Sequence, residues 1–267
     1  MISQYLIVAG YTFKIFFENS DNTFYRNKWL EDIKKYYGNF IPDLKPKKID
    51  YSIRFVERKT YPIIKKSEKG KKYINYFIDS DHRKATTFYI ISIAQFELIL
   101  MDIVCKLFQN DGGFFIHTSA VYARDGAFLF TGKSHSGKST IINLLNPAFT
   151  PFVDDIGIIR KKNNSYYLYQ TPHHEKGDSI NKNSSGFLIK KIFFLKKSNI
   201  NEIKKITSKN EIIQKLTFQV IVYFIQNKFS IKHLLEFIAV FDTYYLLSFN
   251  TNREELLQFI NKFIILY

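Results

Sequence analysis

The sequence is poor in cysteine, methionine, glycine and proline: 267 residues include one cysteine, Cys105, two methionines, 11 glycines and 6 prolines. A single cysteine excludes both a disulfide within one chain and a zinc site built from several cysteines, and it fits a reducing compartment. No stretch reaches the roughly 18 uninterrupted apolar residues of a membrane-spanning helix. The first residues lack the basic segment and the small-residue cleavage site of a secretory signal. We therefore expect a cytoplasmic protein without a membrane partner.

Acidic residues are also scarce, because 24 Asp and Glu face 39 Lys and Arg, which gives a net charge of +15. Such a charge attracts anions, including nucleotides, acidic proteins and nucleic acids. The lysines are scattered in pairs, such as Lys34-Lys35 and Lys196-Lys197, and form no basic tail or arginine-rich arm. We therefore expect no nucleic-acid partner, and the phosphates of a bound nucleotide explain part of the charge more simply.

The most specific feature is residues 132–139, GKSHSGKS, which satisfy the Walker A pattern G-x-x-x-x-G-K-[ST]. A strand-like run precedes this segment and a helix-like run, Thr140 to Leu145, follows it. In such a loop the backbone N–H groups point at phosphate oxygens, the lysine reaches the outer phosphates, and the hydroxyl after it binds Mg²⁺. The expected contacts to ATP are Gly132, Lys133, Ser134, His135, Ser136, Gly137, Lys138, Ser139 and Thr140.

The strand before this segment is expected to have an antiparallel partner. Phe114 to Arg124 and Ala127 to Thr131 are strand-like, and Asp125-Gly126 between them is typical of a two-residue hairpin turn. The commonest nucleotide-binding folds instead place parallel strands beside the loop, connected through helices.

Two carboxylates, Asp154 and Asp155, follow Lys138 at a distance that allows a short helix and a return into a neighbouring strand. Phosphoryl transfer needs one carboxylate to hold the metal ion and a group that accepts the proton of the attacking hydroxyl. We expect the adjacent aspartates to divide these tasks, with Ser139 as a further Mg²⁺ ligand. The sequence leaves open which aspartate does which.

Histidines are weaker candidates. His117 lies on the strand antiparallel to the one that enters the loop, and it could face the same pocket, although a lone strand histidine is usually structural. His135 occupies a loop position that tolerates any residue. His173-His174 lack an obvious third ligand for a metal ion, so they suggest at most a contact to substrate or nucleotide.

Hydrophobic patterning indicates an α/β protein with two parts. Residues 1–84 predict a small α+β accessory region: a strand pair within 5–17 around Gly10, a helix at 27–37, and strands at 51–57 and 73–79. Residues 85–267 predict the catalytic domain. It begins with a helix at 85–109, and its elements after the aspartates are strands at 166–170, 187–195 and 243–249 and helices at 211–226, 231–240 and from Arg253.

The run from Ile116 through Asp155 resembles the catalytic domain of bacterial HPr kinase/phosphorylase, whose core is similar to the nucleotide-binding part of phosphoenolpyruvate carboxykinase. Four features match in register: a histidine that opens the antiparallel strand, the hairpin, the phosphate loop and the paired aspartates. The resemblance implies a P-loop core with a mixed sheet, ATP and Mg²⁺ at Gly137, Lys138 and Ser139, and catalysis by Asp154, Asp155, His117 and Lys138. His117 would assist the aspartate that acts as base. The related HPr enzymes include hexamers, which leaves a homo-oligomer open.

Thr140 stands where the HPr enzymes commonly have glutamate, and their glycine-rich dephosphorylation signature has no clear copy, which argues against phosphorylase activity. The N-terminal part looks more like the accessory region of HPr-kinase-like proteins of ribosomal peptide biosynthesis, including kinases of lasso-peptide precursors. The expected function is an ATP- and Mg²⁺-dependent kinase acting on a serine of a peptide or protein. The alternatives are a small-molecule kinase of the same fold, for a free amino acid or sugar, and a non-catalytic nucleotide-binding switch.

Overall fold

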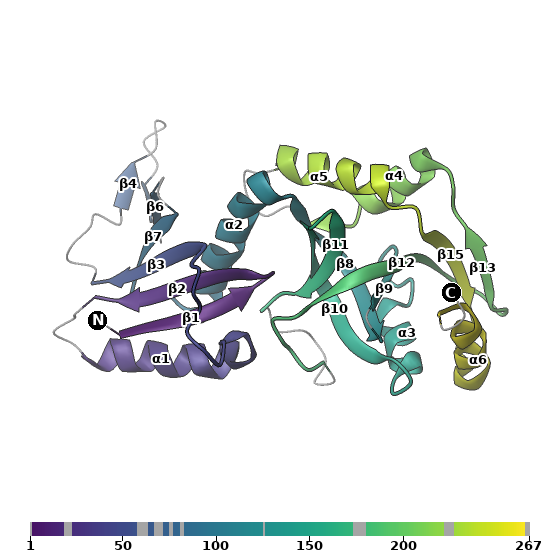
Figure 1. The fold of residues 1–267 in the computed structure, drawn as a ribbon, viewed down its shortest axis with the longest axis horizontal. Helices are drawn as coiled ribbons and strands as arrows, with labels where there is room; N and C mark the ends of the chain where they lie inside the picture. Colours follow the sequence, from purple (N-terminus) through teal and green to yellow (C-terminus); the bar gives the residue numbers. More distant parts are fainter. Residues whose placement is uncertain are drawn as a thin grey trace. The chain divides into compact units, whose positions relative to one another are not determined.

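The computed structural model describes residues 2–18, 23–57, 64–66, 72–74, 77–80, 83–124, 126–172, 180–221 and 227–264. Contacts divide this chain into two compact units, Met1–Val104 and Cys105–Tyr267. The boundary falls inside one helix, α2 (Ile93–Asp111), rather than after the expected residue 84. The protein is of the mixed α/β class, with helices and sheets in both units (Figure 1).

The first unit is built on a five-stranded sheet of order β1-β2-β3-β7-β6. Its strands and first helices are β1 (Ile2–Val8), β2 (Tyr11–Phe17), α1 (Thr23–Tyr37), the 3₁₀ turn η1 (Gly38–Phe40), β3 (Tyr51–Val56), β6 (Phe77–Ser80) and β7 (Lys84–Phe88). The short strands β4 (Ile64–Lys66) and β5 (Lys72–Ile74) pair separately. β1 and β2 form the expected hairpin, whose turn residues Ala9 and Gly10 both have positive φ.

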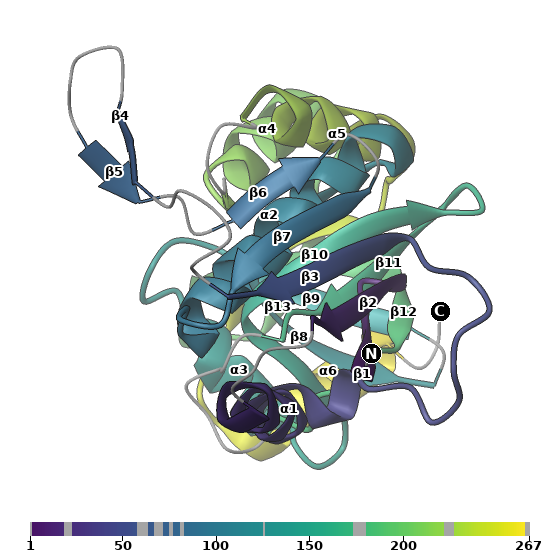
Figure 2. The same ribbon diagram turned by 90° about the vertical axis from the view of Figure 1, so that its left-hand side faces the viewer.

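One face of this sheet is buried beneath helices. Alternate residues of β2 are buried, which is the period-two pattern of a half-covered strand. The Trp29 ring of α1 lies 4.7 Å from the Phe55 ring of β3 and 5.7 Å from the Phe96 ring of α2. Figure 2 shows the strands in front of α2. The aromatic residues thus form the core between the sheet and its two helices.

The expected helix at 85–109 is wrong at its start. Residues 84–88 form β7, which extends the sheet in parallel beside β3, and the β-branched pair Thr86-Thr87 suits a strand. The helix begins only after Ser92, whose hydroxyl accepts a hydrogen bond from the Gln95 N–H while the Gln95 side chain accepts one from the Ser92 N–H. This reciprocal pattern is a capping box, and it sets the start of α2.

The second unit is an eight-stranded mixed sheet whose main path is β11-β10-β8-β9-β12-β15-β13. Its strands are β8 (Gly113–Ala123), β9 (Gly126–Thr131), β10 (Thr150–Lys162), β11 (Ser165–Gln170), β12 (Gly186–Lys197), β13 (Glu202–Lys205), β14 (Val220–Ile221) and β15 (Tyr244–Phe249). Its helices are α3 (Lys138–Leu145), α4 (Lys209–Thr217), α5 (Asn227–Val240) and α6 (Arg253–Ile264). β9 pairs antiparallel with β8 and parallel with β12, so the expected antiparallel partner is present.

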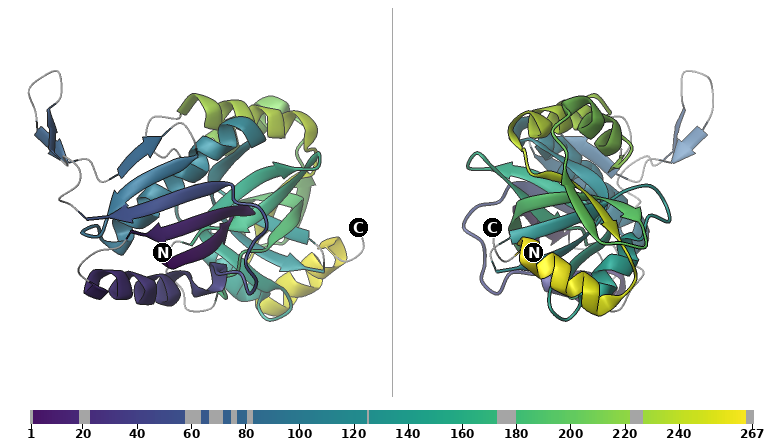
Figure 3. Two further views of the ribbon diagram at one scale, coloured as in Figure 1. Left: turned by 60° about the vertical axis from the view of Figure 1, so that its left-hand side comes forward. Right: turned by 90° about the vertical axis from the view of Figure 1, so that its right-hand side faces the viewer.

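Two hydrophobic cores cover the two faces of this sheet. Successive residues of β9 alternate between them: Leu129 packs with residues of α4 and α5, whereas Phe128 and Phe130 pack with residues of α3 and α6. β12 alternates in the same way. The right-hand view of Figure 3 shows α6 on one side of the strands and α4 and α5 on the other. Burial on both faces fixes β9 and therefore the point at which the chain leaves it.

Two local expectations fail in this unit. Gly126 is not a turn residue, because it pairs with Ala123 as the first residue of β9; Asp125, the other expected turn residue, lies outside the described residues. The helix expected at 211–226 ends at Thr217, and Val220 and Ile221 pair with β8. β14 pairs with the part of the β8 edge that β9 leaves unpaired. This tertiary contact overrides the local helix propensity of these residues.

Candidate functional site

The segment 132–139, hereafter the 132–139 loop, runs from the end of β9 to the start of α3. Gly137 precedes the helix with φ of 98°, a left-handed conformation that favours glycine. A Cβ added there would lie 2.7 Å from the Phe249 ring, so no side chain fits without a shift. The local geometry is therefore the strand, glycine-rich loop and helix that the motif requires.

Lys138 lies beside both predicted carboxylates. Its Nζ donates to the carbonyl oxygens of Gly132 at 3.0 Å and Lys133 at 3.3 Å, so the side chain folds back over the loop. Burial lowers the pKa of Lys138, and the negative charges of Asp155 and Asp154 partly offset this effect. The ammonium group is thus held between loop carbonyls and carboxylates, close to the first turn of α3.

Asp154 is bound by two hydroxyl groups. Its Oδ1 accepts a hydrogen bond of 2.9 Å from Ser139 Oγ, at the start of α3, and one of 2.6 Å from Ser119 Oγ, on β8. Ser119 and Asp154 are register partners across the antiparallel β8–β10 pair. Strand pairing therefore brings Asp154 to the predicted Mg²⁺-binding serine.

Asp155 has a different partner. Its Oδ1 lies 3.2 Å from Nε2 of His117, and both side chains are about two-fifths exposed, at 37% and 40%. The backbone of His117 is fixed on both sides, because its N–H donates to the Gln219 carbonyl oxygen and its own carbonyl oxygen accepts from Thr131 Oγ1. The histidine is therefore positioned where β9 enters the loop and β14 begins.

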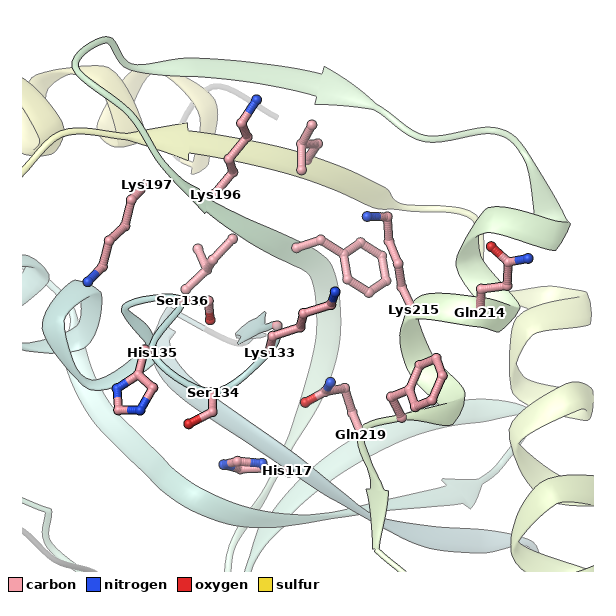
Figure 4. A pocket seen from close by; sticks show the side chains of 15 residues that line it. His117, Lys133, Ser134, His135, Ser136, Lys196, Lys197, Gln214, Lys215 and Gln219 are labelled. Atoms are coloured by element: carbon pink, nitrogen blue, oxygen red, sulfur yellow. The ribbon is translucent and has the colours of Figure 1, made fainter.

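A cavity of about 1050 Å³ borders the loop on the side of α4, the carboxyl end of β12 and Leu246 in the middle of β15. Figure 4 shows the side chains that line it. The lining residues are His117, Gly132, Lys133, Ser134, His135, Ser136, Phe194, Leu195, Lys196, Lys197, Gln214, Lys215, Phe218, Gln219 and Leu246. Of the predicted residues, the first five of the loop, 132–136, and His117 therefore line this space.

Most of the predicted residues come together in one place. Lys138, Ser139, Asp154, Asp155 and His117 meet where β9 ends, beside the middle of β8 and of β10, and Thr140 follows in the first turn of α3. His135 has a left-handed backbone, φ of 64°, and faces the cavity. His173 and His174 lie outside the described residues.

Sequence reasoning missed Ser119 and the lysines beyond the loop. Ser119 follows His117 by two positions on one strand, so period-two alternation could have placed both on one face. Lys196 and Lys197 end β12, which runs parallel to β9, and ligands of α/β sheets bind at the carboxyl ends of strands. Applied to β12, this rule identifies Lys196 and Lys197 as candidate ligand contacts.

The donor set fits a nucleotide with Mg²⁺. The Ser139 hydroxyl and the Asp154 carboxylate offer two oxygen atoms side by side, and Mg²⁺ is commonly held by one or two carboxylates together with substrate phosphates. Within the described part of the chain, three or more His, Cys, Asp or Glu side chains nowhere gather as a potential metal cluster. The buried Ser136 hydroxyl, inside the loop, has no hydrogen-bond partner among the described residues, so a donor remains for a ligand.

Comparisons with known proteins give little family information. No family model matches the chain, and no curated protein matches it. Among solved structures, an HPr(Ser) kinase/phosphatase from Coxiella burnetii is similar at 11% identity and a TM-score of 0.29, over 57% of this chain and 96% of that one. The functional conclusion therefore depends on the geometry of the site.

None of the described helices is long and apolar enough to cross a membrane.

Proposed function

We propose that the protein is an ATP- and Mg²⁺-dependent kinase that transfers the γ-phosphoryl group to a hydroxyl, most simply a serine of a peptide or protein. One observation carries the proposal. Beside a loop with the Walker A pattern, one aspartate contacts the predicted metal-binding serine, and the adjacent aspartate contacts a histidine that faces a cavity. These are the parts that phosphoryl transfer requires.

The contacts support different tasks for the two aspartates. Asp154, which accepts hydrogen bonds from Ser139 and Ser119, would hold Mg²⁺ together with the Ser139 hydroxyl. When bound, Mg²⁺ neutralises charge on the transferred phosphate. Asp155 would accept the proton of the attacking hydroxyl, and His117 would orient that carboxylate through their 3.2 Å contact. Lys138 would leave its loop carbonyls and bind the outer phosphates.

Transfer of phosphate is the direct test of this function. The protein is incubated with ATP, Mg²⁺ and serine-containing peptides, with free serine and sugars as small acceptors, and products are analysed by mass spectrometry. The proposal predicts a gain of about 80 Da in a peptide, the mass of one phosphoryl group. Gain only in a small acceptor would favour the small-molecule kinase. Tight ATP binding without any acceptor would favour the nucleotide-dependent switch.

Substitution of Gly137 by alanine is expected to destabilise the loop conformation in two ways, through backbone strain and through a steric clash. A left-handed backbone costs a non-glycine residue about 1–2 kcal/mol, and the new Cβ would also meet the Phe249 ring at 2.7 Å. We expect a lower free energy of unfolding in chemical denaturation and weaker ATP binding in calorimetry.

Gly112→Ala is the matched control for Gly137→Ala. Gly112 also has a positive φ, 76°, but a Cβ there meets nothing closer than 3.7 Å. This variant should lose a similar amount of stability from backbone strain and keep its ATP affinity. Unchanged nucleotide affinity in Gly137→Ala, with the protein folded, would contradict the role given to the loop.

A further inference from the structure

The charged side chains that line the cavity beside the 132–139 loop are all positive. Four lysines line it: Lys133 from the loop, Lys196 and Lys197 from the end of β12, and Lys215 from α4. None of the described lining residues is acidic. In Figure 4, Lys133 and Lys215 extend toward the same space from the loop and from α4. A ligand with several negative charges would complement this lining.

Part of the lining is apolar. Lys215 Nζ lies 5.6 Å from the centre of the Phe194 ring, so the lysine stem and this ring cover one wall together. Phe218, at the turn after α4, exposes 84% of its surface, and Leu246 adds a further apolar contact. A peptide that carries both carboxylates and an apolar side chain would match both kinds of surface.

The position of His117 links this cavity to the predicted chemistry. His117 lines the cavity and contacts Asp155, whereas Lys138, Ser139 and Asp154 are not among the residues that line it. A ligand in the cavity would therefore reach the proposed base past His117. The volume of about 1050 Å³ slightly exceeds the range of roughly 300–1,000 Å³ for small-molecule sites, so the cavity has room for part of a peptide.

We propose that the part of this cavity formed by Lys196, Lys215 and Phe218, beyond the loop residues expected to contact ATP, is the acceptor site, and that it selects peptide segments with acidic side chains close to the acceptor serine. The inference depends on the proposed kinase function and adds the class of substrate. Lys196 and Lys215 hold the acidic side chains, Phe218 contacts an apolar one, and the serine hydroxyl reaches Asp155 past His117.

The test uses three fluorescent peptides of one length, each with a central serine and one phenylalanine, whose flanking residues are glutamate, glutamine or lysine. Fluorescence anisotropy without ATP measures binding to the full chain. We expect the glutamate peptide to bind about tenfold more tightly than the glutamine peptide, with a difference that shrinks as salt increases. Equal affinity for these two peptides would overturn the proposal.

Variants locate the binding site. The double variant Lys196→Gln/Lys215→Gln should lose the preference for the glutamate peptide, about tenfold in affinity, and keep its ATP affinity within about twofold. The control Lys204→Gln removes a lysine that is 65% exposed on β13, outside the cavity, and should change neither. Weaker ATP binding with unchanged peptide binding would assign the cavity to the nucleotide and overturn the proposal.

Transfer assays separate this inference from the function on which it depends. Lysine-dependent binding of the glutamate peptide together with its phosphorylation supports both. The same binding without transfer to any peptide supports the ligand class of the cavity and contradicts the kinase. Transfer to the glutamine peptide with the same kcat/KM as to the glutamate peptide supports the kinase and overturns the inference.

Discussion

Asp155→Asn should lower kcat by about 10²- to 10⁴-fold, the contribution typical of a positioned general base. Asparagine has a similar size but cannot accept the proton of the attacking hydroxyl, and the contact with His117 Nε2 loses its charge. Because the Ser139 hydroxyl donates to Asp154, whereas Asp155 contacts His117, ATP affinity should change little. Steady-state kinetics with an accepted peptide and calorimetry with ATP measure the two effects.

Two further variants control this prediction. Asp242→Asn removes an exposed carboxylate just before β15 and should leave kcat unchanged. Asp154→Asn should instead raise the Mg²⁺ concentration needed for half-maximal activity, because Asp154 is the carboxylate bound by Ser139. If Asp155→Asn kept full turnover, or if the two aspartate variants shifted the Mg²⁺ dependence equally, the division of tasks would be wrong.

Lys138→Met should weaken ATP binding by about 10- to 150-fold, which corresponds to the loss of one hydrogen bond between charged groups, worth about 1.5–3 kcal/mol. Methionine keeps the length of the side chain and removes the charge that would meet the outer phosphates. Competition with a fluorescent ATP analogue measures the affinity.

Stability and charge are controlled separately for Lys138→Met. The variant also loses the bonds from Nζ to Gly132 and Lys133, so circular dichroism must show that it folds. Lys162→Met, at the exposed end of β10, removes the same charge away from the loop and should bind ATP as the unchanged protein does. An affinity of folded Lys138→Met equal to that of the unchanged protein would contradict the proposed phosphate contact.

The parts of the fold that follow from local sequence were predictable. The β1–β2 hairpin and the strands β8 and β9 each carry runs of apolar or β-branched residues bounded by turn residues, and the structure contains all of them. The 132–139 loop was predictable for the same reason, since its glycines and Lys138 are fixed by a short pattern between a strand and a helix.

Errors arose where tertiary contacts decide the structure. Residues 85–88 were predicted as the start of a helix, yet they belong to a strand that pairs with β3. The helix begins only at the capping box formed by Ser92 and Gln95. Residues 220–221 pair with β8 only because β9 leaves that edge open. Neither pairing is visible in a window of neighbouring residues.

The candidate site, like the fold, was predictable from the sequence only in part. Spacing indicated that Asp154 and Asp155 return toward Lys138, but it gave no means to distinguish them. The distinction comes from the register of β10 against β8, which shifts between Pro151 and Val153 and pairs Asp154 with Ser119. A shift of one residue would pair Asp155, instead of Asp154, with Ser119, so the proposed division of roles depends on the structure and not on the spacing.

Isothermal titration calorimetry of the full chain with ATP, in the presence and absence of Mg²⁺, measures whether the 132–139 loop binds a nucleotide. We expect saturable binding of one nucleotide per chain, strengthened by Mg²⁺, and loss of this strengthening in Asp154→Asn because that carboxylate would hold the metal ion. Absence of saturable binding at millimolar ATP with Mg²⁺ would contradict the kinase proposal, since the loop, Lys138 and both aspartates would then have no phosphate to act on.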